Sequence, residues 1–183
     1  MSGSFSLRPW LDRFYLLGGW GAALSIAGIF ILMLVQSGSR ELGIQVRGAD
    51  DISAWLCAAS AFLGLAHTLR SGDMVRVGLW IDAMSERWQR RTEIVVLLIA
   101  IVFCGYALYA VSDFVWQSYQ MNELSQGLVI VPIWIPQTSV VVGVLMLFVA
   151  LIDELACVLR GQIPHYRQAA AERLARGEFG ESV

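Results

Sequence analysis

Four long stretches without a charged side chain constrain the fold of this sequence more than any other feature. They cover Phe14–Ser39, Ile52–Leu69, Ile94–Ser112 and Leu124–Ile152. An α-helix of about 20 apolar residues crosses the hydrocarbon core of a bilayer, and each stretch reaches or approaches that length. A backbone inside the bilayer must form its hydrogen bonds internally, as a helix does. The sequence therefore predicts an all-α integral membrane protein with four transmembrane helices.

The composition agrees with a membrane protein. Of the 183 residues, 57% are hydrophobic and 15% are charged, whereas soluble domains carry about 25% charged residues. The net charge of -2 argues against a nucleic-acid partner, which selects a clustered basic surface. We expect one membrane domain over residues 1–160 and a cytoplasmic tail over residues 161–183. The spans are predicted at about 14–37, 52–70, 93–113 and 133–153.

The distribution of arginine predicts the orientation. With four spans, the amino terminus, the second loop and the tail share one side of the membrane. That side holds eleven arginines, and the opposite side holds two, Arg40 and Arg47. Because cytoplasmic loops of membrane proteins are enriched in basic residues, both termini are expected in the cytoplasm.

The segment between the second and third spans, residues 73–91, is too charged to cross a bilayer. Its apolar residues recur at helical spacing, which predicts an amphipathic helix lying in the interface. Such a helix could be a partner-binding arm or a connector that buries its apolar face in lipid, and the sequence leaves both readings open. Four arginines in and around this segment are predicted contacts of lipid headgroups. They are Arg70, Arg76, Arg90 and Arg91.

The two prolines near the fourth span, Pro132 and Pro136, raise the question of whether that helix is broken. A helix that begins near Ile133 places Pro136 in its first turn, where the missing N–H costs little. Pro132 then precedes the helix and biases Val131 away from helical geometry. We interpret the prolines as a start signal for the last span, with a broken helix lining a site as the alternative.

Asp50 and Asp51 come directly before the second span. Acidic side chains stabilise a helix amino terminus, where N–H groups lack partners and the macrodipole favours negative charge. Helix capping is therefore the simplest role of the pair, and contact with a partner protein is the alternative.

The sequence shows no arrangement of residues typical of an enzyme. The three cysteines lie far apart and form no metal-binding spacing, and His67 has no histidine in another span with which to hold a haem. Charged residues lie at the ends of the predicted spans or outside them, whereas ion-coupled transport by one chain requires such groups at membrane depth. We expect no catalytic residue, no metal and no cofactor, and we interpret the chain as part of a larger assembly.

The order of these features resembles the small, four-span membrane subunit ("Q" type) of tripartite ATP-independent periplasmic (TRAP) transporters. The family has an acidic pair before the second span, as in Asp50–Asp51, followed by a Leu-Gly pair, as in Leu63-Gly64. A short turn follows that is loosely matched by GDMVRVGLW at Gly72–Trp80. The fourth span opens with a Ser-x-Gly…Pro-x-Trp pattern, matched by SQGLVIVPIW at Ser125–Trp134. The resemblance covers about residues 10–160.

The resemblance implies an accessory scaffold subunit of a secondary-active, ion-coupled symport system in the bacterial inner membrane. Its partners would be a large multi-span permease subunit that carries the solute site and a periplasmic binding protein that delivers the solute, often a carboxylate. The alternative is a stand-alone four-helix exporter or channel that forms an oligomer. We predict partner or docking contacts at the charges of the outer loops and at the start of the last span. They are Arg40, Glu41, Arg47, Asp50, Asp51, Asp113, Glu123, Pro132 and Trp134.

Overall fold

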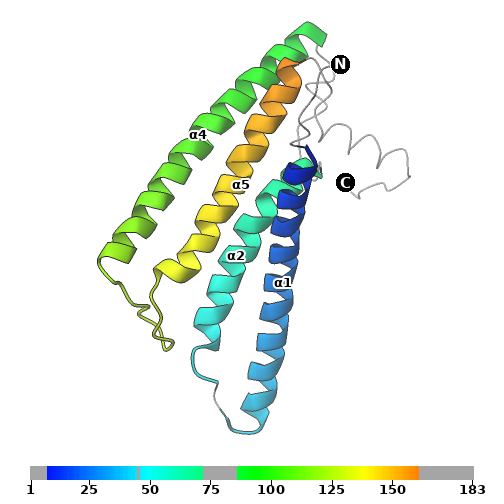
Figure 1. Ribbon diagram of the computed structural model, residues 1–183. Helices are drawn as coiled ribbons and strands as arrows, with labels where there is room; N and C mark the ends of the chain where they lie inside the picture. The colour runs from blue at the N-terminus through cyan, green and yellow to red at the C-terminus, as the bar shows by residue number, and fades with distance from the viewer. Residues whose placement is uncertain (1–7, 45, 72–85, 161–183) are drawn as a thin grey trace, which may run out of the picture. The chain divides into compact units, whose positions relative to one another are not determined.

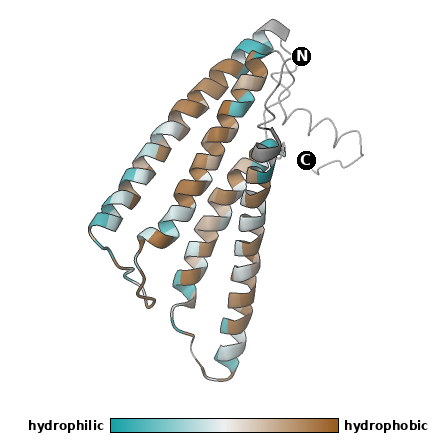
Figure 2. Cartoon of the chain, viewed as in Figure 1, coloured by the Kyte–Doolittle hydropathy of each residue, from teal (hydrophilic) through white to brown (hydrophobic). Residues whose placement is uncertain are grey.

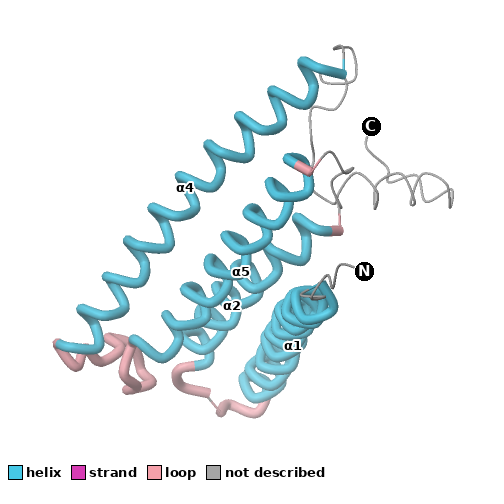
Figure 3. The backbone as a smooth tube through the Cα atoms, turned by 45° about the horizontal axis from the view of Figure 1, so that its top comes forward, coloured by secondary structure: helices cyan, strands magenta, loops and turns pink. Residues whose placement is uncertain are grey.

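The computed structural model describes residues 8–44, 46–71 and 86–160. These residues form four α-helices: α1 (Arg8–Glu41), α2 (Ala49–Arg70), α4 (Glu86–Gln120) and α5 (Trp134–Leu159) (Figure 1). Within the described part of the chain there is no β-strand, and the tube drawing in Figure 3 shows only helices and loops there. All four helices are long and apolar enough to cross a membrane. The prediction of an all-α protein with four transmembrane helices is confirmed.

The helices extend beyond the uncharged stretches that predict them. The longest, α4, has 35 residues, or about 50 Å at roughly 1.5 Å per residue, and exceeds a hydrocarbon core of about 30 Å. Figure 2 shows polar residues gathered toward the helix ends, with apolar residues between them. Hydropathy marks only the apolar middle of each helix, because backbone hydrogen bonds continue to form where the side chains become polar.

The predicted interfacial helix falls mostly on residues 72–85, which lie outside the described residues, as does the predicted tail over 161–183. The described remainder of that segment, residues 86–91, forms the first turns of α4. The interfacial helix therefore stays a prediction.

The start of the last span agrees with the interpretation of the prolines. Helix α5 begins at Trp134, which places Pro136 in its first turn and Pro132 just before it. The Pro132 carbonyl accepts a hydrogen bond from the Ile135 N–H at 3.1 Å. The helix then runs without interruption to Leu159, so the alternative of a broken helix is set aside.

The chain divides into two compact units. The first, hereafter the glycine-packed unit, comprises the described residues within 8–67 and 107–146. The second, hereafter the side-chain-packed unit, comprises residues 68–71, 86–106 and 147–160. In the glycine-packed unit, α2 packs against α1 and against the first half of α5. In the side-chain-packed unit, the first part of α4 packs against the second half of α5. Large apolar side chains on α1 and α4 are mostly exposed, as expected of helices that face lipid.

Close packing in the first unit depends on small residues. A Cβ added at Gly18 would lie 3.0 Å from the Leu63 carbonyl oxygen of α2, and one added at Gly28 would lie 3.2 Å from a Leu56 methyl group. The Ser25 side chain, on the same face of α1, is buried, and its hydroxyl donates to the Gly21 carbonyl at 2.9 Å. Small residues let membrane helices approach closely, and this face of α1 is covered by α2.

Candidate functional site

The acidic pair stands in the first turn of α2. The turn before it contains Gly48 at φ +81°, a left-handed conformation that a glycine adopts without strain. Helix α2 begins there, with the Ile52 N–H donating to the Gly48 carbonyl at 3.2 Å. Asp50 is exposed and Asp51 is half-buried, so the two carboxylates face different surroundings.

The Asp51 carboxylate binds the loop that joins α4 to α5. One of its oxygens accepts the Leu128 N–H at 2.8 Å and the Val129 N–H at 3.4 Å. Two glycines make this approach possible, because a Cβ at Gly127 would overlap the Asp51 carboxylate and a Cβ at Gly48 would overlap a Val129 methyl group. Asp51 therefore ties together segments that lie 77 positions apart in the sequence, a contact that the expectation of helix capping did not include.

The loop of residues 121–133, hereafter the α4–α5 loop, folds back on itself. The Ser125 N–H donates to the Val131 carbonyl at 2.9 Å, and the Ile133 N–H donates to the Glu123 carbonyl at 3.0 Å. Leu124 and Pro132 form an isolated antiparallel bridge. These bonds pair the backbone at the base of the loop, so Pro132 has a structural role at this position.

Besides Asp51, three more of the predicted docking charges accept hydrogen bonds within the chain. The Glu123 carboxylate accepts the Ser118 hydroxyl at 2.9 Å, and Ser118 is almost fully buried. The Asp113 carboxylate accepts the Gln117 amide one turn later at 2.7 Å. The Asp50 carboxylate accepts the Gln36 amide from the end of α1 at 3.1 Å. These carboxylates are therefore held in place by neighbours in the chain.

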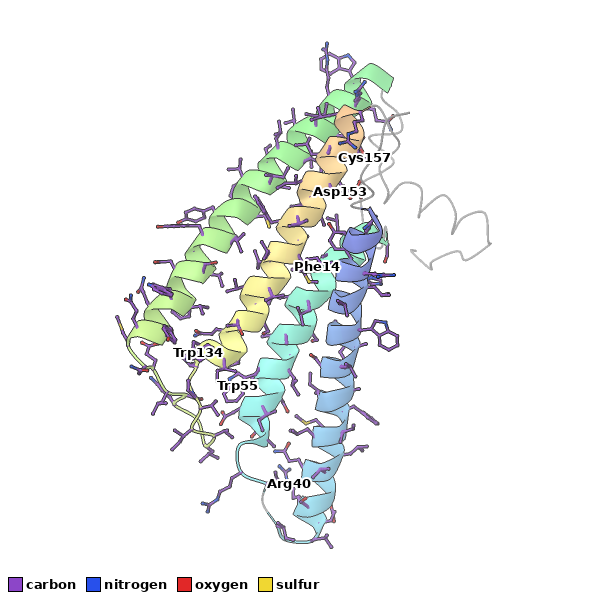
Figure 4. All side chains as sticks on the ribbon, viewed as in Figure 1. Phe14, Arg40, Trp55, Trp134, Asp153 and Cys157 are labelled. Atoms are coloured by element: carbon purple, nitrogen blue, oxygen red, sulfur yellow. The ribbon has the colours of Figure 1, made fainter. Side chains whose placement is uncertain are left out.

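The remaining charges of the outer loops lie near the end of α1. Arg40, Glu41 and Arg47 are exposed, and Figure 4 shows Arg40 at the loop end of α1 and Phe14 toward the opposite end of the same helix. Arg40 and Arg47 line a pocket of ≈ 190 Å³ that also includes Asp50 and Leu128. This pocket brings both loops of the glycine-packed unit together.

The tips of both loops expose large apolar side chains. The exposed fractions are 77% for Leu42, 60% for Ile44, 71% for Leu128 and 73% for Ile130. Trp134 is half-buried beside the α4–α5 loop and contacts the Tyr119 ring edge-on, with the ring centroids 5.6 Å apart. The loop end of this unit thus combines two cations, a clamped loop and apolar tips.

The arginines predicted to bind lipid headgroups have different surroundings. Arg90 donates to the Val158 and Leu159 carbonyls at 3.2 and 3.1 Å and so caps the end of α5. Arg91 lies over the exposed Trp88 ring, 5.7 Å from its centroid. Arg70 is half-buried at the end of α2, and Arg76 lies outside the described residues. The cap formed by Arg90 was not expected from the sequence.

Sequence reasoning also missed Glu154, which it placed just beyond the last span. Helix α5 continues past it, and the Glu154 side chain is buried. The signal was its helical spacing, since Ala150, Leu151 and Val158 are buried on the same face. Gly127 and Gly48 were missed as well, because a glycine contact depends on which distant segment approaches it.

The polar groups at the loop end are carboxylates that accept hydrogen bonds and two exposed guanidinium groups. Nowhere in residues 8–44, 46–71 and 86–160 do three His, Cys, Asp or Glu side chains gather as metal ligands. The carboxylates at the loop end hold backbone and side-chain donors in place, and Arg40 and Arg47 present cationic groups beside apolar surface. This arrangement can position loops and contact another molecule.

Comparison with known families decides the identity. The family model described as tripartite ATP-independent periplasmic transporters, DctQ component, matches residues 29–161. The chain belongs to this family. Among curated proteins, none matches the sequence. As a DctQ-family protein, the chain is the small subunit of a TRAP transporter, a multi-pass membrane protein and a transport component rather than an enzyme, and the alternative of a stand-alone exporter or channel is set aside.

Proposed function

We propose that this DctQ-family subunit supports a large permease subunit by packing one face of α2 against it. That face carries Ala54, Cys57 and Ala61, which follow each other at helical spacing and are exposed. Their neighbour Gly64 is half-buried near Ala22 of α1. Lipid does not select small side chains, whereas close packing of another membrane helix does. The exposed small-residue face of α2 is the observation that carries this proposal.

Co-purification with the large subunit tests the proposed face. Ala61→Leu adds bulk where the partner helix would approach and is expected to reduce the recovered large subunit and solute uptake together. Ala110→Leu is the matched control, because Ala110 is an exposed alanine on α4. Normal assembly with Ala61→Leu, or equal loss with both variants, would reject this face as the interface.

The loop end of the glycine-packed unit is proposed to help dock the periplasmic binding protein. Arg40, Glu41 and Arg47 are the best candidates among the predicted contacts, since Asp50, Asp51, Asp113 and Glu123 accept hydrogen bonds within the chain. The two arginines suit an acidic partner surface, and the apolar loop tips suit its burial. The solute delivered there is proposed to be a carboxylate, taken up with ions by the large subunit.

Charge reversal tests the docking role. Arg40→Glu combined with Arg47→Glu is expected to weaken uptake at a low concentration of binding protein and to restore it at a high concentration, because charge complementarity acts mainly on encounter. Asp113→Lys is the comparison variant, because it also reverses a charge, but at a carboxylate that accepts a hydrogen bond from Gln117 within the chain. An unchanged dependence on binding-protein concentration would assign docking to the large subunit alone.

The orientation is proposed from the arginine distribution, with both termini in the cytoplasm and the protein in the bacterial inner membrane as one domain over residues 1–160. The two described loops of the glycine-packed unit lie at one end of it (Figure 3), as four spans with termini on one side require. A cysteine placed at Gln126 should react with an impermeant reagent from outside intact cells, and one at Arg160 should not. The opposite labelling would invert the topology.

A further inference from the structure

An apolar groove lies between the last turns of α4 and the first turns of α5, within the glycine-packed unit. Its volume is ≈ 390 Å³, and its walls include Val115, Trp116 and Tyr119 of α4 and Trp134, Val141 and Val142 of α5. The Thr138 hydroxyl, which also lines the groove, donates to the Ile135 carbonyl at 2.6 Å. The groove is therefore suited to an apolar occupant, because its lining is almost entirely hydrocarbon and aromatic.

Aromatic rings surround one end of this groove. The ring centroids of Trp116 and Tyr119 are 5.9 Å apart, and those of Tyr119 and Trp134 are 5.6 Å apart with the rings nearly perpendicular. Trp116 is 58% exposed and Tyr119 is 52% exposed. Tryptophan and tyrosine gather at the depth of lipid headgroups, and their exposed faces attract cationic ammonium groups.

The stretch of chain that forms the groove, residues 112–142, carries charge of one sign. From Thr92 to Leu159 the sequence contains no Arg or Lys, and between Ile94 and Ile152 its only charged residues are Asp113 and Glu123. Asp113 precedes Trp116 by three positions and so occupies the same side of α4. A headgroup held at the aromatic end of the groove would lie near this negative charge. The charge favours a lipid that carries an ammonium group over a lipid with net negative charge.

We propose that the groove binds one phospholipid with an ammonium headgroup. An acyl chain lies along Val141 and Val142, and the headgroup ammonium lies at the exposed rings of Trp116 and Tyr119, one helical turn from Asp113. The binding site itself follows from the groove and its charge. In the proposed orientation the groove lies in the leaflet away from the cytoplasm, and this placement rests on the proposed function.

Native mass spectrometry of the full chain in detergent, titrated with phosphatidylethanolamine or phosphatidylglycerol, tests the proposal. One phosphatidylethanolamine is expected per chain, with an affinity about fivefold above that for phosphatidylglycerol, as one unit of charge near a membrane surface confers. Val142→Phe and, on the facing wall, Val115→Phe fill the groove and should abolish this binding. Val102→Phe is the matched control at an exposed position of α4 and should retain it.

Asp113→Asn distinguishes the contribution of the headgroup to lipid binding from that of the acyl chain. It should remove the preference for phosphatidylethanolamine while one lipid still binds. Equal affinity of the wild-type chain for the two lipids, or unchanged binding in both groove-filling variants, would overturn the proposal. Release of the lipid when the large subunit is added would show that a partner helix fills the groove and would overturn it too. If the groove does not bind this lipid, assembly with the large subunit and solute uptake are still expected. Failure of the lipid proposal is therefore distinguishable from failure of the proposed function.

Discussion

The two units of this subunit bring their helices together in different ways. In the glycine-packed unit, a Cβ at Gly143 of α5 would overlap the backbone of Phe62 in α2. In the side-chain-packed unit, a Cβ at Gly105 of α4 would lie 3.2 Å from the edge of the Phe148 ring. A backbone cannot move aside without displacing its helix, whereas a ring can rotate. The first unit therefore fixes helix distance by glycine, and the second fills the space with side chains such as Leu97 and Leu151.

The two units also satisfy unpaired backbone groups with opposite charges. Asp51 accepts N–H groups of the α4–α5 loop, and Arg90 donates to carbonyl groups at the end of α5. Backbone groups at helix ends and in loops lack a partner within the helix and are satisfied by side chains such as these. Asp51 and Arg90, two charged residues at helix ends, therefore act within the chain.

Replacing Gly143 and Gly105 separately by alanine should give the largest difference between the units. Gly143→Ala is expected to lower the free energy of unfolding by about 3 kcal/mol, because overpacking against backbone forces the helices apart. Gly105→Ala should change it by less than about 1 kcal/mol, because the Phe148 ring can shift. Equilibrium unfolding in mixed micelles measures both, and similar losses would refute the contrast.

Asp51→Ala should loosen the α4–α5 loop at a cost of about 2 kcal/mol, since hydrogen bonds to a charged acceptor are lost. Asp50→Ala is the control. It also removes a carboxylate from the first turn of α2, where the helix dipole acts, but it leaves the Asp51 contact with the loop in place. Hydrogen exchange at Leu128 and Val129 should accelerate in the first variant only. Equal acceleration in both would mean that the dipole, not the loop contact, is responsible.

Arg90→Met should fray the end of α5 by about 1 kcal/mol, the contribution of a cation at a helix carboxyl end. Methionine keeps the length of the side chain and removes its donors. Arg91→Met is the neighbouring control, because Arg91 lies over the exposed Trp88 ring. Faster hydrogen exchange near the end of α5 in Arg90→Met alone is expected; slow exchange in both variants would show that the cap is dispensable.

Gly38→Ala should give the smallest effect and the opposite sign. An added Cβ at Gly38 of α1 would meet nothing within 4 Å, so alanine should stabilise the helix by about 0.5 kcal/mol through reduced backbone freedom. Unfolding in mixed micelles measures the gain. A clear loss of stability would indicate that the close packing of the glycine-packed unit extends to the end of α1.

Much of the fold follows from the sequence alone, because hydropathy reports on the bilayer as a solvent. The uncharged stretches located all four helices, and helix chemistry placed Pro136 in the first turn of α5 and the acidic pair in the first turn of α2. The helix ends were harder to predict from the sequence, because helical hydrogen bonding continues where hydropathy falls. The candidate site was predicted only as a set of charges near the outer loops.

The sequence by itself determined that this chain has four membrane-spanning helices, and its motifs led to the DctQ family. Both depend on local properties: apolar length, capping residues and short patterns. Only the tertiary structure decided what Asp51, Arg90 and Gly143 contact, and that Glu154 is buried. Those contacts join segments far apart in the chain, and which segments meet depends on packing that no single stretch encodes.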